Sequence, residues 1–353
     1  MKEYKIAVIP GDGIGIEVVE SAIEVITKQS KNKNYKFTLK YFDWSSEYYF
    51  KHNVMMPKDG ITKLKDFDAI FLGAVGHPDI QDHITLNGLL LPIRRAFDQF
   101  ACVRPSILYP GVDSPLKNIQ PYDIDLVVVR ENTEGEYANV GGFQYQDFPE
   151  EIAVQSAVFT RKGCERVIRY AFELAKTRNK KNHVTSITKS NAQGYSMTLW
   201  DRVFNKVKDD YPAIETNTLL IDAACMDFLR RPKEFDVVVA SNLFGDILTD
   251  IGAIITGSMG LASSGNIDPT NNSPSMFEPT HGSAPDIAGK KIANPMAQIL
   301  TAAIMLDHLG EKDSAKELES SVKKVLEKGE TLTPDLGGNS KTNDVTNAIL
   351  SLL

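Results

Sequence analysis

Short apolar runs alternate with amphipathic segments along the chain. Runs typical of buried strands occupy residues 4–9, 69–72, 126–129, 183–188 and 237–240. Between them, apolar residues recur at helical spacing, as at Ile14, Val18, Val19, Ala22, Ile23 and Ile26, and again over residues 164–176. This spacing places the apolar side chains on one face of a helix, and that face packs on a sheet. The alternation of strands and helices predicts an α/β protein.

A stretch rich in Gly, Ser, Pro and Asn covers residues 256–294. It is too long to be a plain connector, so we expect a functional loop there. No internal repeat, low-complexity tract or linker in the sequence marks a domain boundary.

The chain has 353 residues, a formal net charge of −7 and 42% hydrophobic residues. This length supports two cores, so we expect two domains. The negative charge predicts no general attraction to nucleic acid or anionic membranes. Apolar runs fall short of the roughly eighteen residues that a membrane span needs. The three cysteines lack metal-ligand spacing and are typical of reduced thiols, so we expect a cytoplasmic protein.

A glycine-rich turn, Gly11-Asp12-Gly13-Ile14-Gly15, follows the first predicted strand. A dinucleotide-binding fingerprint requires G-x-G-x-x-G and an acidic residue roughly twenty positions later. Ile16 occupies the position of the last glycine. We therefore interpret the segment as a tight turn whose glycines let strand and helix pack closely, and not as a Rossmann cofactor site.

Three carboxylates follow predicted strands. Asp246 and Asp250 come after strand 237–240 at a spacing that places both on one face near the start of a helix, and Asp222 ends the apolar run 218–221. In α/β sheets ligands bind beyond the carboxyl ends of strands, where such carboxylates suit Mg²⁺ or Mn²⁺. The pattern leaves an alternative open, in which these residues only complement helix dipoles.

Three arginines lie near the ends of predicted elements: Arg94, Arg104 and Arg130. Guanidinium groups bind carboxylates through paired hydrogen bonds, so we interpret these residues as candidates for recognising an acidic substrate. Lys189 at a strand end is a candidate base, and Tyr137 a candidate acid. The pattern alone also allows any of these side chains to be solvated or structural.

Together these stretches resemble the β-decarboxylating dehydrogenases, the family of isocitrate, 3-isopropylmalate, homoisocitrate, tartrate and D-malate dehydrogenases. The resemblance covers nearly the whole chain. It rests on motifs in the family's order: Ile9-Pro-Gly-Asp-Gly-Ile-Gly, Arg94 with Val103-Arg104-Pro105, Val129-Arg130-Glu131-Asn132, Thr188-Lys189-Ser190-Asn191, Asn242-Leu-Phe-Gly-Asp246, Phe277-Glu278-Pro279-Thr280-His281-Gly282-Ser283-Ala284-Pro285-Asp286-Ile287-Ala288-Gly289 and Ala293-Asn294-Pro295.

The resemblance implies an α/β fold of two domains with a large central mixed sheet, distinct from the Rossmann fold. Residues 1–101 and 254–353 would form a large domain that carries the NAD site. Residues 102–253 would form a small domain with the dimer interface and a clasp arm. The implied assembly is a homodimer with shared active sites.

The resemblance also implies residue roles around NAD. Glu278 and the backbone of His281, Gly282, Ser283 and Ala284 would line the cofactor site, and Asn294 would meet the adenine. Asp286 occupies the position where NADP-using relatives carry a lysine. Its carboxylate would accept ribose hydroxyls and repel a 2′-phosphate, which favours NAD.

The catalytic roles carry over in the same way. Asp246, Asp250 and Asp222 of the partner subunit would hold Mn²⁺ or Mg²⁺, and a role for K⁺ is left open. Arg94, Arg104 and Arg130 would bind the substrate carboxylates. Lys189, also from the partner, would help to deprotonate the C2 hydroxyl, and Tyr137 would act as general acid after loss of carbon dioxide.

Within the family, residues 44–49, 55–60, 76–78, 82–84, 97–100 and 134–137 most resemble tartrate and D-malate dehydrogenases. One departure is Thr85-Leu86-Asn87-Gly88, where that group has Ser-Leu-Trp-Gly. It is closer to the Ser-Leu-Asn of isocitrate dehydrogenases. We expect Thr85 and Asn87 to contact the substrate, with Asn87 near a polar C3 substituent, although residues 89–91 leave an apolar alternative open.

The sequence thus predicts NAD-dependent and metal-dependent oxidation and β-decarboxylation of a 2-hydroxy diacid. D-Malate conversion to pyruvate and carbon dioxide, tartrate oxidation, or both are the first choice, and 3-isopropylmalate or isocitrate is the alternative. An alternative from a different functional class is a catalytically silent regulatory subunit, which should lack an acid, base or metal carboxylate. A pure nucleotide-binding module would not need the arginines together with the carboxylates.

Overall fold

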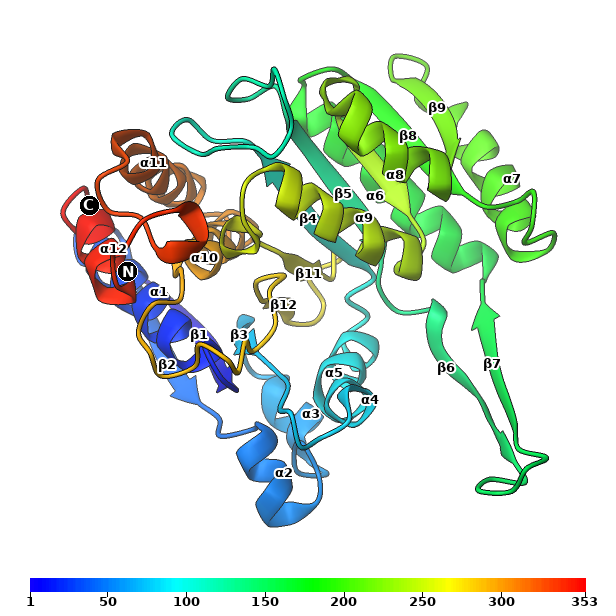
Figure 1. Cartoon of the computed structure of the whole chain (residues 1–353), viewed down its shortest axis with the longest axis horizontal. Helices are drawn as coiled ribbons and strands as arrows, with labels where there is room; N and C mark the ends of the chain where they lie inside the picture. The colour runs from blue at the N-terminus through cyan, green and yellow to red at the C-terminus, as the bar shows by residue number, and fades with distance from the viewer. The chain divides into compact units, whose positions relative to one another are not determined.

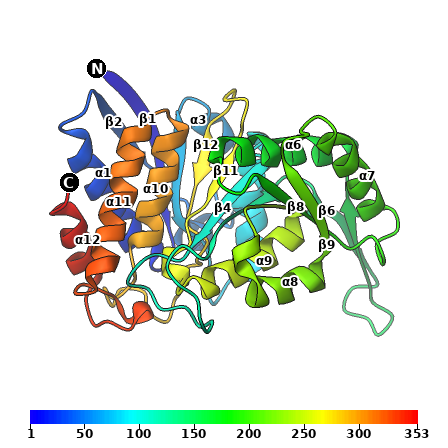
Figure 2. The same cartoon turned by 90° about the horizontal axis from the view of Figure 1, so that it is seen from above.

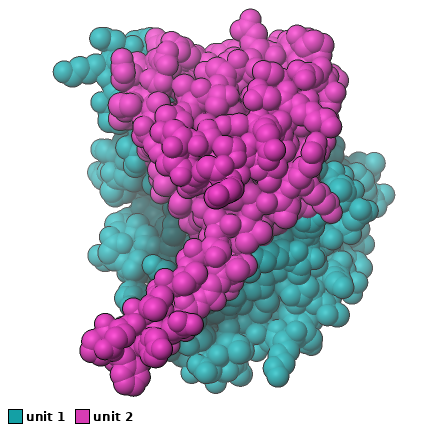
Figure 3. Space-filling view, turned by 90° about the vertical axis from the view of Figure 1, so that its right-hand side faces the viewer, with its two compact units in different colours: residues 1–99, 103–125, 252–353 teal, residues 100–102, 126–251 magenta.

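The computed structural model describes residues 1–353, which form two compact units (Figure 3). Unit 1 consists of residues 1–99, 103–125 and 252–353, and unit 2 of residues 100–102 and 126–251. The functions expected for the two domains stay predictions.

Unit 1 is built on a mixed sheet. Its strands, in spatial order, are β2 (Tyr35–Tyr41), β1 (Lys2–Gly11), β3 (Ala69–Ala74), β12 (Ser275–Phe277), β11 (Gly265–Ile267) and β4 (Ala101–Ile107), most of which belongs to this unit. β2, β1, β3 and β12 are parallel, whereas β11 runs antiparallel to β12. All six residues of β3 are buried, as expected for a parallel strand covered on both faces.

Four helices of unit 1 pack together. α1 (Gly15–Ser30), α10 (Met296–His308), α11 (Lys312–Lys328) and α12 (Thr342–Leu350) pack on one another beside the strands (Figure 2). The others are α2 (Ser46–His52), α3 (Gly60–Leu64), α4 (Asp82–Thr85), the π-helix η1 (Leu86–Leu90), α5 (Leu91–Ala96) and the 3₁₀ turns η3 (Met259–Leu261) and η4 (Pro334–Leu336). α1 buries the apolar face predicted from its sequence, including Val18, Ala22 and Ile26.

The glycine-rich turn joins β1 to α1 by close backbone packing. A Cβ atom on Gly11 would lie 1.9 Å from the carbonyl oxygen of Ala74, and Gly11 has φ +74°. At Gly15 a Cβ would approach the backbone of Pro10 and Ala74 to 2.5 Å. The interpretation of this segment as a tight packing turn is therefore confirmed.

The stretch over residues 256–294, expected to be a functional loop, is not a loop throughout, and its functional part stays a prediction. It contains β11 and β12, which belong to the sheet of unit 1. Each strand has only three residues, too few to show a period in a segment rich in Gly and Ser.

Unit 2 contains four parallel strands in the order β5 (Asp125–Glu131), β10 (Val237–Ala240), β8 (His183–Thr188) and β9 (Glu215–Leu220). Its helices are α6 (Arg161–Arg178), α7 (Ser196–Lys208), α8 (Ile221–Arg230), the turn η2 (Pro232–Glu234) and α9 (Asn242–Ile255), whose last residues belong to unit 1. The four residues of β10 are all buried between β5 and β8, which explains the run Val-Val-Val-Ala.

A two-stranded arm extends from the rest of unit 2 (Figures 1 and 3). It pairs β6 (Gly135–Gln144) with β7 (Ile152–Val158) in antiparallel fashion. Phe143, Val154 and Phe148 at the turn are 63%, 56% and 65% exposed, so the arm leaves a substantial apolar surface uncovered. Its expected part in a dimer clasp stays a prediction. None of the helices in the chain is both long and apolar enough to cross a membrane.

Candidate active site

In unit 1, a predicted substrate residue and a predicted cofactor residue form a buried ion pair. Arg94, in the last turn of α5, donates from Nη2 to Oε1 of Glu278 at 2.5 Å. The two side chains are only 7% and 8% exposed. Asn266, a buried residue of β11, donates to the same oxygen at 2.9 Å. Nε of Arg94 is buried without a hydrogen-bond partner and remains available as a donor.

The remaining predicted substrate residues of unit 1 lie on three elements. Arg104 is buried in β4. Thr85 ends α4, and its hydroxyl donates to the carbonyl of Asp82 at 2.9 Å. Asn87 lies in the π-helix η1, where its Nδ2 donates to the carbonyl of His83 at 2.8 Å while its Oδ1 is buried without a partner. Single π-turns occur frequently at functional sites, and here one presents an unused amide oxygen.

The predicted cofactor segment from His281 to Ala284 lies against the glycine-rich turn. The carbonyl of Ser283 accepts from the N–H of Ile14 at 2.9 Å. Gly13, at φ +54°, comes so close that an added Cβ would lie 2.0 Å from the same carbonyl oxygen. Burial lowers the pKa of His281, which favours the neutral ring. This segment also exposes Gly282, so backbone groups are open to a ligand.

The two predicted cofactor residues that follow this segment, Asp286 and Asn294, differ in exposure. Asp286 is exposed, as recognition of a ribose from solution would require. Asn294 is buried, and its Nδ2 donates to Oδ2 of Asp335 at 3.0 Å while its Oδ1 accepts from the N–H of Met296 at 3.0 Å. Asn294 therefore holds the start of α10 through Oδ1 and the turn η4 through Nδ2.

In unit 2, three predicted residues come together around α9. Arg130, near the end of β5, is buried and pairs through Nη1 with Oδ1 of Asp246. The hydroxyl of Tyr137 donates to the other oxygen of Asp246 at 2.9 Å, and the guanidinium lies 5.2 Å from the Tyr137 ring centroid. The candidate acid, a candidate metal ligand and a candidate substrate residue thus form one cluster.

Lys189 and Asp222 form a second pair in unit 2. Lys189 follows β8 directly, and its ammonium donates to Oδ1 of Asp222 in the first turn of α8. This hydrogen bond lowers the pKa of Asp222. Asp222 is 60% exposed, so the pair faces solvent.

Within one chain the predicted metal carboxylates are not all brought together. Asp246 and Asp250 lie one helical turn apart on α9, as predicted, and Asp250 is exposed. The described chain contains no group of three or more His, Cys, Asp or Glu residues placed to hold an ion. The oxygen donors on α9 suit a hard divalent cation, and the expected contribution of Asp222 from a partner subunit stays a prediction.

Two residues with structural roles near the predicted site residues were not predicted. Oδ1 of Asn242 accepts from Nε and Nη2 of Arg130 at 3.0 and 2.7 Å, and so orients the guanidinium. The carboxylate of Asp12 accepts from the backbone N–H and hydroxyl of Ser46 and from the N–H of Gly76, at 2.7 to 2.9 Å. Both residues lie inside motifs noted in the sequence. Their partners are 34 to 112 positions away, so only the fold reveals the contacts.

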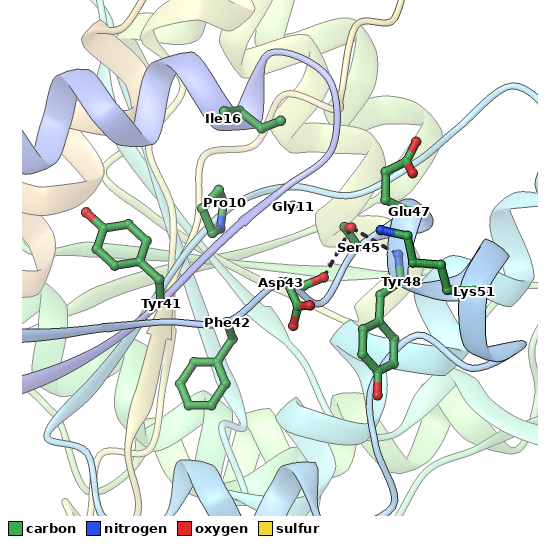
Figure 4. Close-up of a pocket in the computed structure, with 10 residues that line it drawn as sticks. All are labelled: Pro10, Gly11, Ile16, Tyr41, Phe42, Asp43, Ser45, Glu47, Tyr48 and Lys51. Atoms are coloured by element: carbon green, nitrogen blue, oxygen red, sulfur yellow. Dashed lines mark hydrogen bonds between the residues drawn. The ribbon is translucent and has the colours of Figure 1, made fainter.

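A cavity of about 430 Å³ opens in unit 1 beyond the ends of β1 and β2 (Figure 4). Its lining includes Pro10, Ile16, Tyr41, Tyr48 and Lys51. None of the predicted site residues lines it. The aromatic walls are partly exposed, and no buried polar group without a partner points into this cavity.

The comparisons with known proteins agree on one family. The family model for isocitrate/isopropylmalate dehydrogenase matches residues 5–349. A probable tartrate dehydrogenase/decarboxylase of Bacillus subtilis (strain 168) is 51% identical over 355 residues, which cover 100% of this chain and 99% of that protein. The D-malate dehydrogenase [decarboxylating] of Escherichia coli (strain K12) is 47% identical over 360 residues, with 100% and 99% covered.

A solved structure gives the same picture. The crystal structure of isocitrate dehydrogenase from Methylococcus capsulatus superposes with a TM-score of 0.89 at 37% identity and covers 99% of each chain. The resemblance stated from the motifs, including its leaning toward tartrate and D-malate dehydrogenases, is confirmed, as is the α/β fold with a mixed sheet.

Proposed function

Because the chain belongs to the isocitrate/isopropylmalate dehydrogenase family, we propose that it oxidises and β-decarboxylates a 2-hydroxy diacid with NAD and a divalent cation. The first-choice reactions are conversion of D-malate to pyruvate and carbon dioxide, and oxidation of tartrate. The observation that carries the proposal is the cluster of Arg130, Tyr137 and Asp246, in which one carboxylate touches both a guanidinium and a phenol.

The arginines would bind the two carboxylates of the substrate. Arg94 and Arg104 are buried in unit 1 and Arg130 in unit 2. A buried guanidinium makes strong, charge-assisted hydrogen bonds to a carboxylate, because water does not compete. Thr85 and Asn87 would contact the C3 side of the substrate, where Oδ1 of Asn87 is an unused acceptor for a hydroxyl group.

The cofactor in this proposal is NAD. Glu278, the segment from His281 to Ala284 and Asn294 would line its site. Exposed Asp286 supports the preference over NADP, because its carboxylate can accept ribose hydroxyls and would repel a 2′-phosphate.

The metal in this proposal is Mn²⁺ or Mg²⁺, held by Asp246, Asp250 and Asp222 of the partner subunit. When bound, such a cation supplies polarisation of the C2 oxygen of the substrate. This ligand set implies a homodimer in which Lys189 and Asp222, which pair with each other within one chain, serve the active site of the other subunit. A K⁺ requirement and a cytoplasmic location stay predictions.

Two side chains would carry out the proton transfers of the reaction. Lys189 of the partner subunit takes the C2 hydroxyl proton as the C2 hydride leaves for the nicotinamide, which gives a β-keto acid and NADH. The C3–carboxylate bond then breaks, and its electron pair forms the enolate as carbon dioxide leaves. Tyr137 donates its phenolic proton to C3, which completes the keto acid product.

The alternative substrates are 3-isopropylmalate and isocitrate. Asn87 favours isocitrate among them, because a rotated amide N–H can donate to the extra carboxylate of isocitrate, whereas an isopropyl group would leave the amide oxygen buried and unpaired. A silent regulatory subunit is disfavoured, since the acid, base and metal carboxylates are all present.

The test is NADH formation with Mn²⁺ on D-malate, the tartrate isomers, 3-isopropylmalate and isocitrate at equal concentration, with NADP as control. Preference for D-malate or tartrate with NAD supports the proposal. Preference for isocitrate would indicate that Asn87 determines the choice of substrate. No activity with any of these compounds would favour the regulatory subunit.

A further inference from the structure

Glu136 connects the strand that carries Tyr137 to the start of α9. Its Oε1 accepts from the hydroxyl of Ser241 at 2.9 Å, and its Oε2 accepts from the backbone N–H of Leu243 at 3.1 Å. α9 begins at Asn242, so the N–H of Leu243 is one of the first-turn donors that the helix itself cannot satisfy. Glu136 therefore caps α9 although it lies more than a hundred positions before this helix in the chain.

The next residue holds the same helix at a second point. The hydroxyl of Tyr137 donates to Asp246, which lies three residues beyond Leu243 on α9. Consecutive side chains of a regular strand point to opposite faces. Here the pairing of β6 with β7 is irregular between Gly135 and Val140, and such irregularities re-aim side chains, so both residues reach α9.

The neighbouring carboxylate provides an internal comparison. Glu134 lies immediately before β6, but its oxygens accept from the N–H and hydroxyl of Thr160 at 2.9 and 2.8 Å, at the start of α6. Only its backbone carbonyl reaches α9, by accepting from Nδ2 of Asn242 at 3.2 Å. Glu134 and Glu136 thus each accept from one hydroxyl and one backbone N–H, but Glu134 holds the start of α6 and Glu136 the start of α9.

We propose that Glu136 is a positioning residue that keeps the hydroxyl of Tyr137 in place against Asp246 by fixing β6 to the first turn of α9. The inference rests on the proposed function, because Tyr137 is the acid that protonates C3 there. Glu136 acts through hydrogen-bond geometry, so an amide should replace it. A glutamine can accept from Leu243 and donate to the hydroxyl of Ser241.

The first measurement is the ratio of the steady-state rate of pyruvate formation to the rate of the first-turnover burst of NADH, both measured on D-malate with Mn²⁺. Misplacing the acid slows C3 protonation after hydride transfer is complete, so Glu136→Ala should lower this ratio by roughly tenfold, which is part of the roughly 10²–10⁴-fold that a positioned acid contributes. Glu136→Gln should restore the wild-type ratio. Glu134→Ala, the matched control, should leave the ratio unchanged, because the lost contacts hold α6.

The second measurement needs neither cofactor nor metal. Hydrogen exchange of the Leu243 amide should be roughly tenfold faster in Glu136→Ala than in Glu134→Ala, which is the size expected for one lost hydrogen bond to a charged group. Unchanged exchange elsewhere in unit 2 would show that Glu136→Ala remains folded.

The outcomes separate the two proposals. A wild-type protein that reduces no NAD with any hydroxy diacid overturns the proposed function and, with it, the catalytic role of Glu136. An active wild type in which Glu136→Ala and Glu134→Ala give the same ratio of steady-state pyruvate rate to NADH burst rate overturns only the positioning role. A Glu136→Gln variant as impaired as Glu136→Ala also overturns it, since charge and not geometry would then matter.

Discussion

The ion pair of Arg94 and Glu278 should make a large contribution to the stability of unit 1. Both side chains are more than nine-tenths buried, and the N–O distance is 2.5 Å. Arg94→Leu leaves the carboxylate of Glu278 buried with only the hydrogen bond from Asn266. Removal of one partner from a buried pair costs about 3–5 kcal/mol, and we expect the lower end of this range because Asn266 remains.

A double-mutant cycle separates this pairing from simple loss of packing. Glu278→Leu should also cost about 3 kcal/mol, because it leaves a buried guanidinium unpaired. In the double variant neither charge is left alone, so its loss should be about 3 kcal/mol and well below the sum of the single losses. Exposed Arg95, the neighbour on α5, supplies the control, and Arg95→Leu should change stability by no more than about 0.5 kcal/mol.

The two tryptophans make the assay specific to one unit. Trp44 is buried in unit 1 and Trp200 in unit 2. Urea unfolding followed by fluorescence in a Trp200→Phe background therefore reports on the unit that contains the ion pair, provided that the urea dependence stays unchanged between variants. A midpoint for Arg94→Leu equal to that of Arg95→Leu, or a double variant that loses the full sum, would refute the reasoning.

Three further outcomes are expected. Gly13→Ala should lower the free energy of unfolding by more than about 1–2 kcal/mol in the same assay, because φ is +54° and the new Cβ would lie 2.0 Å from the Ser283 carbonyl oxygen; unchanged stability would contradict that geometry. Burial lowers the pKa of His308 from its ordinary 6.5, against the opposing charges of Asp268 and Asp307. The unfolded chain therefore binds more protons below about pH 6.5, stability falls as the pH falls through that value, and His308→Leu should make urea midpoints between about pH 7.5 and 5.5 less dependent on pH. Asp286→Ala should raise kcat/KM for NADP relative to NAD by roughly tenfold, since repulsion of the 2′-phosphate is removed; an unchanged ratio in initial-rate assays would exclude this residue as the discriminator.

Much of the fold is visible in the sequence because burial leaves a pattern. β10 is covered by neighbours on both sides, and its sequence is a continuous apolar run. α1 packs one face on the sheet, and its apolar residues recur at helical spacing. β11 and β12 show neither signal, since each has three residues in a Gly-rich segment and is held by its place between β3 and β4 in the sheet and not by propensity.

The site was predictable in its residue types and not in its contacts. Asp246 and Asp250 share a face of α9 because their spacing along the chain is a helical turn. By contrast, Arg130 meets Asn242 across 112 positions, and Glu136 reaches Ser241 across 105. Such contacts depend on how β5, β6 and α9 are arranged, which local pattern does not encode.

The decarboxylating reaction can be tested most directly by its stoichiometry. The purified protein would be given D-malate, NAD and Mn²⁺, and NADH and pyruvate would be quantified in the same sample at several times. We predict equal amounts of the two products, together with loss of pyruvate formation in Tyr137→Phe. NADH that accumulates without pyruvate, or pyruvate formation that is unaffected in Tyr137→Phe, would contradict the proposed chemistry.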